Sequence, residues 1–575
     1  MKDPGKADLV IRNARVFNSY LKKFTARDVY IRDGLFFYLD ERKQNEIQAT
    51  ESLDAAGRYL VPGLIDIHMH IESSLVTPRA FGEHTVSHGL TTIVSEPHEI
   101  ANVCGMAGIK AMIADGRKAP YDIYYAIPSN VPVMGAEFET AGAKITCEDM
   151  LELKDTENVI CLGEVMNYLE IIRENDSEVG KFIDIVNRTD PRYIKEGHCP
   201  QLKDADLARF LYLGIGSDHC THDLEELRQR FENGMFVQIQ DVMMKQEVID
   251  YIIANDLYEC FSFVTDDTFP DFLVERGHLD NIVRKAIKMG MKPEMAIYCA
   301  THTPAMRMKL TDRGDIAPGK LADFLLLDDL DNFSICATYK KGKKVYGRHT
   351  YRPCEDTYTL GKQFEETVKI KVPDIEDFEV RVPGKDRTVN VRVMEISRHN
   401  NVVGETWRRM AVVNNRLQWQ DTDCRLVMVL ERHGKSGHIS YGFSSGDDLK
   451  EGAVASSLTH DSHNVIVMGT NAADMKQALE ELVRLHGGFV VVNKGNITGE
   501  LALPIAGLMS NHSVEQTARD FTGVRKAMEA QGYVHGNTVM NLCLLSLTCS
   551  PFLKLTDQGY MDTVSLKMVP LYKEL

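Results

Sequence analysis

Residues 63–74 read GLIDIHMHIESS, an apolar run that ends in two histidines, a glutamate and two serines. The run is typical of a buried strand. His68 and His70 are two positions apart, so on a strand both imidazoles would point to the same face. A strand with a solvated polar end is the simpler interpretation, and half of a metal site is the alternative.

Further apolar runs decide the fold prediction, because they alternate with helical or loop stretches. Continuous apolar runs arranged in this way are typical of parallel strands covered on both faces. A span of about 250 residues is usual for a (β/α)8 barrel. We therefore predict a TIM-like (β/α)8 barrel at residues 61–309. Seven runs, with FVQIQ at 236–240 as the eighth, carry the prediction: YLVPGLIDIH, GLTTIVSE, YDIYYAIP, VICLGEV, YIKEGH, YLGIGSDH and YECFSFVTDD.

Shorter alternating segments flank the predicted barrel, among them LVIRNARVF before it and KLADFLLLDD after it. This pattern predicts antiparallel strands. We expect residues 1–60 and 310–350 to form one composite β-sandwich into which the barrel is inserted. Residues near 350–370 are predicted to be a linker. Strand and helix patterns at 371–575 predict a C-terminal α/β domain.

The composition limits the class of protein. The apolar fraction of 44% and the charged fraction of 26% over 575 residues are ordinary for a globular chain. The net charge of −17 argues against a nucleic-acid partner, and no apolar run approaches the ~20 residues that span a bilayer. The N-terminus does not resemble a secretory signal, and the twelve cysteines are scattered. We expect a cytoplasmic protein with no membrane partner.

Polar residues end most of the predicted barrel strands. In such a barrel the carboxyl ends of the strands carry the chemistry. Taken singly, a histidine here is more often a hydrogen-bonded residue, and TDD is more often a turn or a helix cap. Together, ionisable groups at the ends of separate apolar strands are costly unless they meet a cation. Besides His68 and His70, these endings supply Glu164, His198, Asp218, His219, Asp266 and Asp267.

The mixture of imidazole and carboxylate donors favours zinc, manganese or iron over a soft metal. The four histidines and two of these carboxylates already exceed the needs of one tetrahedral ion. Two ions bridged by Glu164 and a hydroxide would use them all. Such a pair lowers the pKa of a bound water and supplies a nucleophile near neutral pH.

Longer motifs resemble one family. PGLIDIHMHIESS followed by GLTTIVSEPHEIANVCG is similar to the adenine deaminase family of the amidohydrolase superfamily. The later pieces GEVMNY, EGHCP, GSDH, TDD, GHLD, SSLTHDSHN, LPIAGLMS and LKLTDQG fall in the same order, so the resemblance covers nearly the whole chain. It implies hydrolytic deamination of adenine to hypoxanthine and ammonia by a hydroxide that a binuclear metal centre activates.

The resemblance also implies a role for each strand ending. His68 and His70 would bind one ion, and His198 and His219 the other. Glu164 would bridge the two, and Asp266 would bind metal and shuttle the proton. The cofactors implied are two divalent metal ions, manganese or iron, with zinc as the alternative.

Residues just beyond these positions are candidates for contact with the purine or for proton transfer. Glu72, His98 and Glu99 are predicted catalytic residues, and Glu99 is also a predicted substrate contact. Ser73, Ser74 and Cys220 complete the predicted substrate-binding residues, although either serine alone could cap a helix. The motif with His460, Asp461 and His463 leaves a third metal site, a pocket wall and a capped turn open.

Three positions differ from the family pattern and leave the substrate open. Cys220 stands where glutamate is usual, Glu96 where aspartate is usual, and Gln240 where a basic residue is usual. Adenine deamination is therefore one hypothesis. A related metal-dependent amidohydrolase acting on another aminopurine or a cyclic amide is the second, and a catalytically silent binding protein is the third. The family also implies a homo-oligomer, a dimer or larger.

Overall fold

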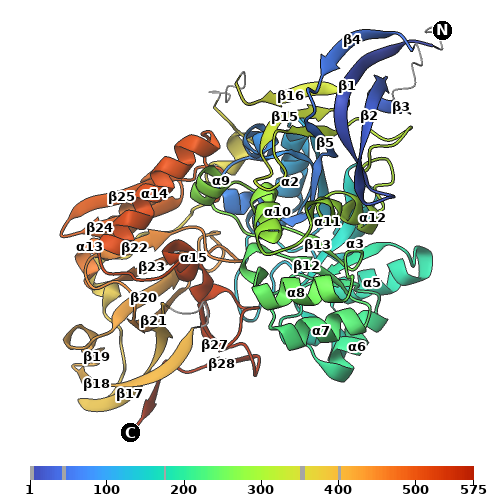
Figure 1. Cartoon of the computed structure of the whole chain (residues 1–575). Helices are drawn as coiled ribbons and strands as arrows, with labels where there is room; N and C mark the ends of the chain where they lie inside the picture. Colours follow the sequence, from blue (N-terminus) through green and yellow to red (C-terminus); the bar gives the residue numbers. More distant parts are fainter. Residues whose placement is uncertain (1–4, 42–46, 174–176, 350–356, 399–402) are drawn as a thin grey trace.

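The computed structural model describes residues 5–41, 47–173, 177–349, 357–398 and 403–575. Figure 1 shows N-terminal strands at one end, strands and helices of a barrel in the middle, and a strand-rich C-terminal part beside it. We call residues 357–398 and 403–575 the C-terminal region. Within the part of the chain described, no helix is long and apolar enough to cross a membrane. Of the predicted linker, residues 350–356 lie outside the described residues.

Eight parallel strands among the described residues form the barrel. They pair in the order β10-β9-β8-β7-β6 and β11-β12-β13. A parallel bridge between Met69 and Asp266 joins β6 to the end of β13, and the Gly216 amide donates to the Lys195 carbonyl at 3.0 Å between β10 and β11. The predicted (β/α)8 fold is confirmed. The strands are Leu64–Met69 (β6), Leu90–Ser95 (β7), Asp122–Ile127 (β8), Val159–Val165 (β9), Ile194–Gly197 (β10), Ser217–Asp218 (β11), Phe236–Ile239 (β12) and Phe261–Phe263 (β13).

Hydrogen bonds join the first and last barrel strands beside the histidines. The Asp266 amide donates to the His68 carbonyl at 3.1 Å. The Thr265 hydroxyl donates to Asp66 Oδ2 at 2.6 Å and lies 3.0 Å from His278 Nε2. A buried carboxylate is costly without such partners. Asp66, a charged residue within an apolar run, is therefore part of the barrel closure.

Helices and short 3₁₀ segments connect the barrel strands. Local sequence explains several of their starts: Thr77 caps α1 ahead of a proline, and Thr146 and Asp223 open capping boxes at α3 and α7. The helices are Pro78–Thr85 (α1), His98–Gly116 (α2), Cys147–Lys154 (α3), Tyr168–Arg173 (α4), Glu178–Thr189 (α5), Asp204–Tyr212 (α6), Leu224–Glu232 (α7), Gln246–Ala254 (α8), Pro270–Arg276 (α9), Leu279–Lys288 (α10), Pro293–Cys299 (α11) and His302–Arg307 (α12). The 3₁₀ segments are Ile71–Ser74 (η1), Val86–His88 (η2) and Asp241–Met243 (η3).

Strands before and after the barrel share one sheet, in the order β16-β15-β14-β5-β1-β2-β3, with β4 on β1. Leu60 of β5 pairs antiparallel with Leu326 of β14, so the two ends of the barrel segment meet. The run YLVPGLIDIH thus contains two strands, the first of which belongs to this sheet. The boundaries predicted for the domains stay a prediction. The strands are Ala7–Asn18 (β1), Lys23–Arg32 (β2), Leu35–Asp40 (β3), Ala49–Asp54 (β4), Tyr59–Pro62 (β5), Phe324–Leu327 (β14), Ile335–Lys340 (β15) and Lys343–Gly347 (β16).

The C-terminal region contains a ten-stranded sheet in the order β19-β18-β17-β21-β20-β23-β22-β24-β25, with β29 on β17, and a smaller sheet β26-β27-β28. Helix α13 packs on β22, β23 and β24, and α14 packs on β25. The strands are Arg387–Ile396 (β17), Gly404–Val413 (β18), Arg416–Leu417 (β19), Arg425–Leu430 (β20), Ile439–Gly446 (β21), Ala453–Ser456 (β22), Val465–Gly469 (β23), Gly488–Asn493 (β24), Asn496–Ala502 (β25), Leu553–Thr556 (β26), Gly559–Asp562 (β27), Lys567–Val569 (β28) and Tyr572–Glu574 (β29). The helical segments are Lys362–Phe364 (η4), Ile375–Phe378 (η5), Trp419–Asp421 (η6), Ala472–Arg484 (α13), Val514–Ala530 (α14), Thr538–Cys543 (α15) and Leu544–Ser546 (η7).

Helix α14 also packs on the barrel. It contacts α9, where Arg525 Nη2 lies 2.8 Å from Asp271 Oδ2. At its first turn Glu515 Oε1 lies 2.8 Å from His84 Nδ1 of α1. The contact and charge of His84 hold the pKa of Glu515 down to about 2, although burial acts to raise it. The ionised form of Glu515 therefore stabilises this junction.

We expect Glu515→Gln to lower the unfolding midpoint by a few degrees near neutral pH. Because the pKa of Glu515 is lowered on folding, its contribution is present above its ordinary value of 4.5 and is lost as the pH falls through about 2. Thermal unfolding of both proteins across that range is the measurement. Glu529→Gln, an exposed change on the same helix, is the control. Equal unfolding midpoints of the two proteins across the whole range would contradict the assignment.

Candidate metal centre

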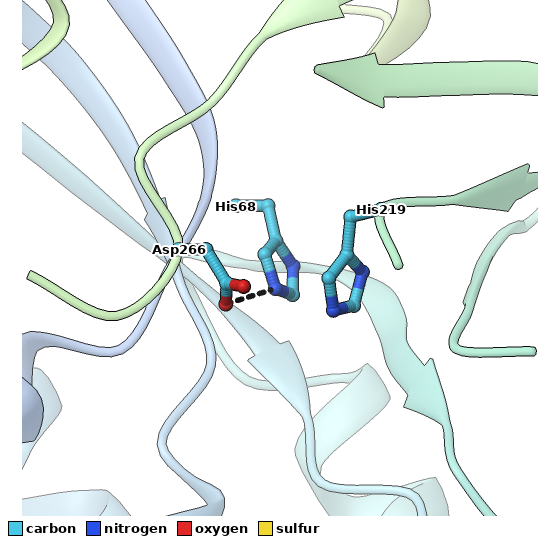
Figure 2. A group of neighbouring side chains, drawn as sticks. All are labelled: His68, His219 and Asp266. Atoms are coloured by element: carbon cyan, nitrogen blue, oxygen red, sulfur yellow. Dashed lines mark ion pairs between the residues drawn. The ribbon is translucent and has the colours of Figure 1, made fainter. Parts of the chain in front are cut away.

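The strand endings meet at one end of the barrel. His68 lies in β6 and His70 directly follows it. Glu164 lies in β9. His198 directly follows β10, and His219 directly follows β11. Asp266 is the third residue after the end of β13. Figure 2 shows three of the group side by side, with His68 between Asp266 and His219. All six predicted ligands are brought together, namely His68, His70, Glu164, His198, His219 and Asp266.

The first half of the cluster surrounds Asp266. His68 Nε2 and His70 Nε2 each lie 3.3 Å from Asp266 Oδ1. His70 Nε2 also lies 3.3 Å from Glu164 Oε1. Asp266 has a φ of 55°, a left-handed conformation that aspartate tolerates better than most residues. Four donors thus converge from the first and last strands of the barrel and from β9.

The second half surrounds the other carboxylate oxygen of Glu164. His198 Nδ1 lies 2.9 Å and His219 Nε2 lies 3.1 Å from Glu164 Oε2. The two ring nitrogens are 3.1 Å apart. Glu164 therefore presents one oxygen to each half, which is the geometry that a bridging carboxylate requires.

The donor set fits divalent cations. Neither ring nitrogen of His68 makes a well-aligned hydrogen bond among the described residues, although the side chain is fully buried and Nε2 lies 3.3 Å from Asp266 Oδ1. Burial, together with the charge of His219, lowers the pKa of His68 to about 4. Although burial acts to lower them, contact with Asp266 raises the pKa of His70 to about 10, and the charge of Glu164 raises the pKa of His219 to about 9. Ligation requires neutral imidazoles, so cation binding would displace the protons of these two histidines. Although burial acts to raise it, the charge of His219 holds the pKa of Glu164 well below its usual range. Imidazole nitrogens and carboxylate oxygens are ligands for such ions.

The residues predicted to contact the purine lie around this cluster. The Glu72 carboxylate accepts from the Ile100 amide at 3.2 Å, and burial raises the pKa of Glu72 to about 7. The Ser73 hydroxyl donates to Asp267. The Ser74 hydroxyl instead donates to the Ile71 carbonyl at 2.5 Å, which is a local hydrogen bond within the 3₁₀ segment η1. Their roles toward a substrate stay predictions.

His98 and Glu99 start helix α2 next to the cluster. His98 Nδ1 lies 3.4 Å from Glu164 Oε1, and its Nε2 lies 3.4 Å from Glu99 Oε1. Glu99 in turn contacts His460 and His463 of the C-terminal region. The sequence could single out THDSHN as a polar motif, but it could not place the motif against Glu99.

Two further polar groups were not assigned from the sequence. Gln240, noted only as a departure from the family, donates through Nε2 to Asp266 Oδ2 at 2.9 Å and to the His219 carbonyl at 2.8 Å. Asp218, a polar strand ending, accepts from Arg230 Nε at 2.6 Å in a buried ion pair. Cys220 is buried and its amide donates to Asp218 Oδ1 at 3.1 Å. Asp218 thus stabilises the end of strand β11 through its contacts with Arg230 and the Cys220 amide.

Comparison with known proteins agrees with the fold. A model of the amidohydrolase family matches residues 59–174 and 194–345, the segment that holds the barrel. This family implies divalent metal ions. A model of the adenine deaminase C-terminal domain matches residues 401–567. The chain belongs to the adenine deaminase family.

Full-length relatives support this placement. The chain is 42% identical over 573 residues to an adenine deaminase of Clostridium perfringens strain 13, covering 99% of each chain. It is 42% identical to adenine deaminase 2 of Shouchella clausii, covering 98% of this chain and 99% of that one. Among solved structures, the β-aspartyl dipeptidase of Fervidobacterium islandicum AW-1 aligns with 61% of this chain and 99% of its own, at a TM-score of 0.47 and 17% identity.

Glu164→Gln tests the bridge. An amide keeps the shape but supplies only one oxygen donor and no charge, so we expect the metal content of purified protein to fall below two ions per chain. Elemental analysis after growth with added manganese is the measurement. Glu157→Gln, which changes an exposed barrel acid, should keep the full content. Unchanged metal and unchanged turnover in Glu164→Gln would show that this carboxylate does not bridge.

Proposed function

We propose that this chain catalyses the hydrolytic deamination of adenine to hypoxanthine and ammonia. The observation that carries the proposal is the 42% identity to adenine deaminases over 99% of both chains. The match extends through the C-terminal region, so it is not a likeness between barrels alone. The cluster of six donors at the barrel mouth supports the same activity.

We further propose that the cluster holds two divalent ions, manganese or iron, with zinc as the alternative. His68, His70 and Asp266 would hold one, His198 and His219 the other, and Glu164 would bridge. The unpartnered buried nitrogens and the two-sided contacts of Glu164 support this division. When bound, such a pair lowers the pKa of a water molecule and makes it a nucleophile near neutral pH.

The proposed proton shuttle is Asp266. One of its oxygens faces the histidines, while the other accepts from Gln240. A carboxylate held in this way can take a proton from the water that attacks C6 and deliver it to the departing amine. Glu72, His98 and Glu99 are the proposed groups for contact with the purine and for protonation of its ring nitrogen. They line the side of the cluster toward α2.

The choice of substrate depends on the residues that differ from the family pattern. Cys220 directly follows His219, and Gln240 contacts Asp266. These two positions favour, as the second candidate, a related amidohydrolase acting on another aminopurine or a cyclic amide. A catalytically silent binding protein would have no need of six converging donors. Self-association and a cytoplasmic location stay predictions.

Ammonia release from a panel of purines and cyclic amides tests the proposed function. Adenine should give the highest kcat/KM. A higher value for another aminopurine or a cyclic amide would establish the second candidate. Cys220→Glu restores the residue usual in the family, and a gain in adenine turnover would show that this chain has diverged from adenine.

Asp266→Asn tests the proton shuttle. We expect this variant to retain at least one ion per chain, because Glu164 and the histidines remain, but to lose turnover by about 10²–10⁴-fold. Metal analysis and initial rates are measured on the same preparation. Retention of substantial turnover would exclude Asp266 as the proton carrier, whatever its metal content.

A further inference from the structure

The loop Thr459–Asn464 connects the neighbouring strands β22 and β23 of the C-terminal region, and it reaches the mouth of the barrel. Its six residues are buried. Asn464 Nδ2 donates to the Thr140 carbonyl of the barrel at 2.9 Å, and Asn464 Oδ1 accepts from the Arg432 amide at 3.1 Å. His433 Nε2 lies 2.9 Å from the Ser462 carbonyl. Both the barrel and the C-terminal sheet therefore fix this loop.

The loop presents two histidines to one carboxylate. His460 Nδ1 lies 2.7 Å from Glu99 Oε1, and His463 Nε2 contacts Glu99 Oε2. Each oxygen of Glu99 thus has its own histidine, and the side chain is 2% exposed. A carboxylate buried so deeply is costly unless its oxygens accept hydrogen bonds. These two contacts supply them.

The tautomer of His463 follows from its second contact. Its Nδ1 accepts from the Thr459 amide at 3.2 Å, so the proton of a neutral imidazole lies on Nε2. His463 therefore donates to Glu99, which must accept as a carboxylate. A side chain without an Nε2 donor could not replace this contact.

Glu99 connects the loop to the metal cluster through one residue. His98 Nε2 lies 3.4 Å from Glu99 Oε1, and His98 Nδ1 lies 3.4 Å from Glu164 Oε1. The His98 ring lies 4.7 Å from the His70 ring, in an edge-to-face arrangement. The position of Glu99 therefore limits where the His98 ring can lie relative to the bridging carboxylate.

We infer that the loop makes the C-terminal region part of the catalytic centre: His460 and His463 are positioning residues that hold Glu99 against His98. This inference rests on the proposed function. The sequence leaves three interpretations open for His460, Asp461 and His463. The inference selects the pocket wall, and the function that it assigns to this wall is to position Glu99.

The test compares two substitutions at the same site. His463→Leu removes the donor, whereas His463→Gln keeps an amide N–H near the position of Nε2. We expect His463→Leu to lower kcat for adenine by about 10–100-fold, as is typical when a supporting hydrogen bond to a site residue is lost. Its metal content should match the wild type, and His463→Gln should recover most of the loss. His438→Leu, an exposed histidine of the same region, should change nothing.

A double-mutant cycle shows whether His463 acts through Glu99. If it does, Glu99→Gln with His463→Leu should be no slower than Glu99→Gln alone. Losses of kcat that multiply in the double variant would overturn the inference. Equal losses of kcat in His463→Leu and His463→Gln would also overturn it, as would a loss of kcat that missing metal explains. If the wild type deaminates adenine and His463→Leu is equally active, the inference is overturned but the proposed function stands. A wild type that releases no ammonia from adenine overturns the proposed function, and the inference falls with it.

Discussion

The closure of the barrel between Met69 and Asp266 is the constraint on which the site depends. The same short segments that close the barrel carry His68, His70 and Asp266. The backbone bond from the Asp266 amide to the His68 carbonyl fixes the first and last strands relative to each other. A small change in this pairing would separate the carboxylate from both imidazoles. Fold and chemistry are therefore determined by one set of contacts.

The sequence predicts much of this because both the strands and their endings are local features. Apolar runs with polar ends indicated the eight strands and the six donors, and the structure brings these donors together. The strand pattern alone does not separate Asp218 from Asp266, since both are acids at strand ends, and only the family resemblance assigned Asp266 to the metal. Only the fold shows that Asp218 accepts from Arg230, whereas Asp266 faces the histidines.

Contacts between distant segments were beyond prediction for a different reason. His460 and Glu99 are 361 positions apart, and no periodicity or composition relates them. The contact of Gln240 with Asp266 depends on where an amide points, which the run FVQIQ does not specify. The ion pair between Arg525 and Asp271 likewise requires that α14 already lie on α9. The contacts of His460 and Arg525 come from packing between the C-terminal region and the barrel, whereas that of Gln240 comes from packing within the barrel.

The antiparallel pairing of β5 with β14 has a consequence for how the chain is made. Leu60 leaves the ribosome long before its partner Leu326, with the whole barrel sequence between them. Until Leu326 pairs with Leu60, one edge of β5 has unpaired backbone groups, and such an edge promotes aggregation of a growing chain. Closing so long a connection is slow, so the N-terminal sheet should be among the last parts to become native. A nascent chain that stalls inside the barrel would be a natural client for a chaperone.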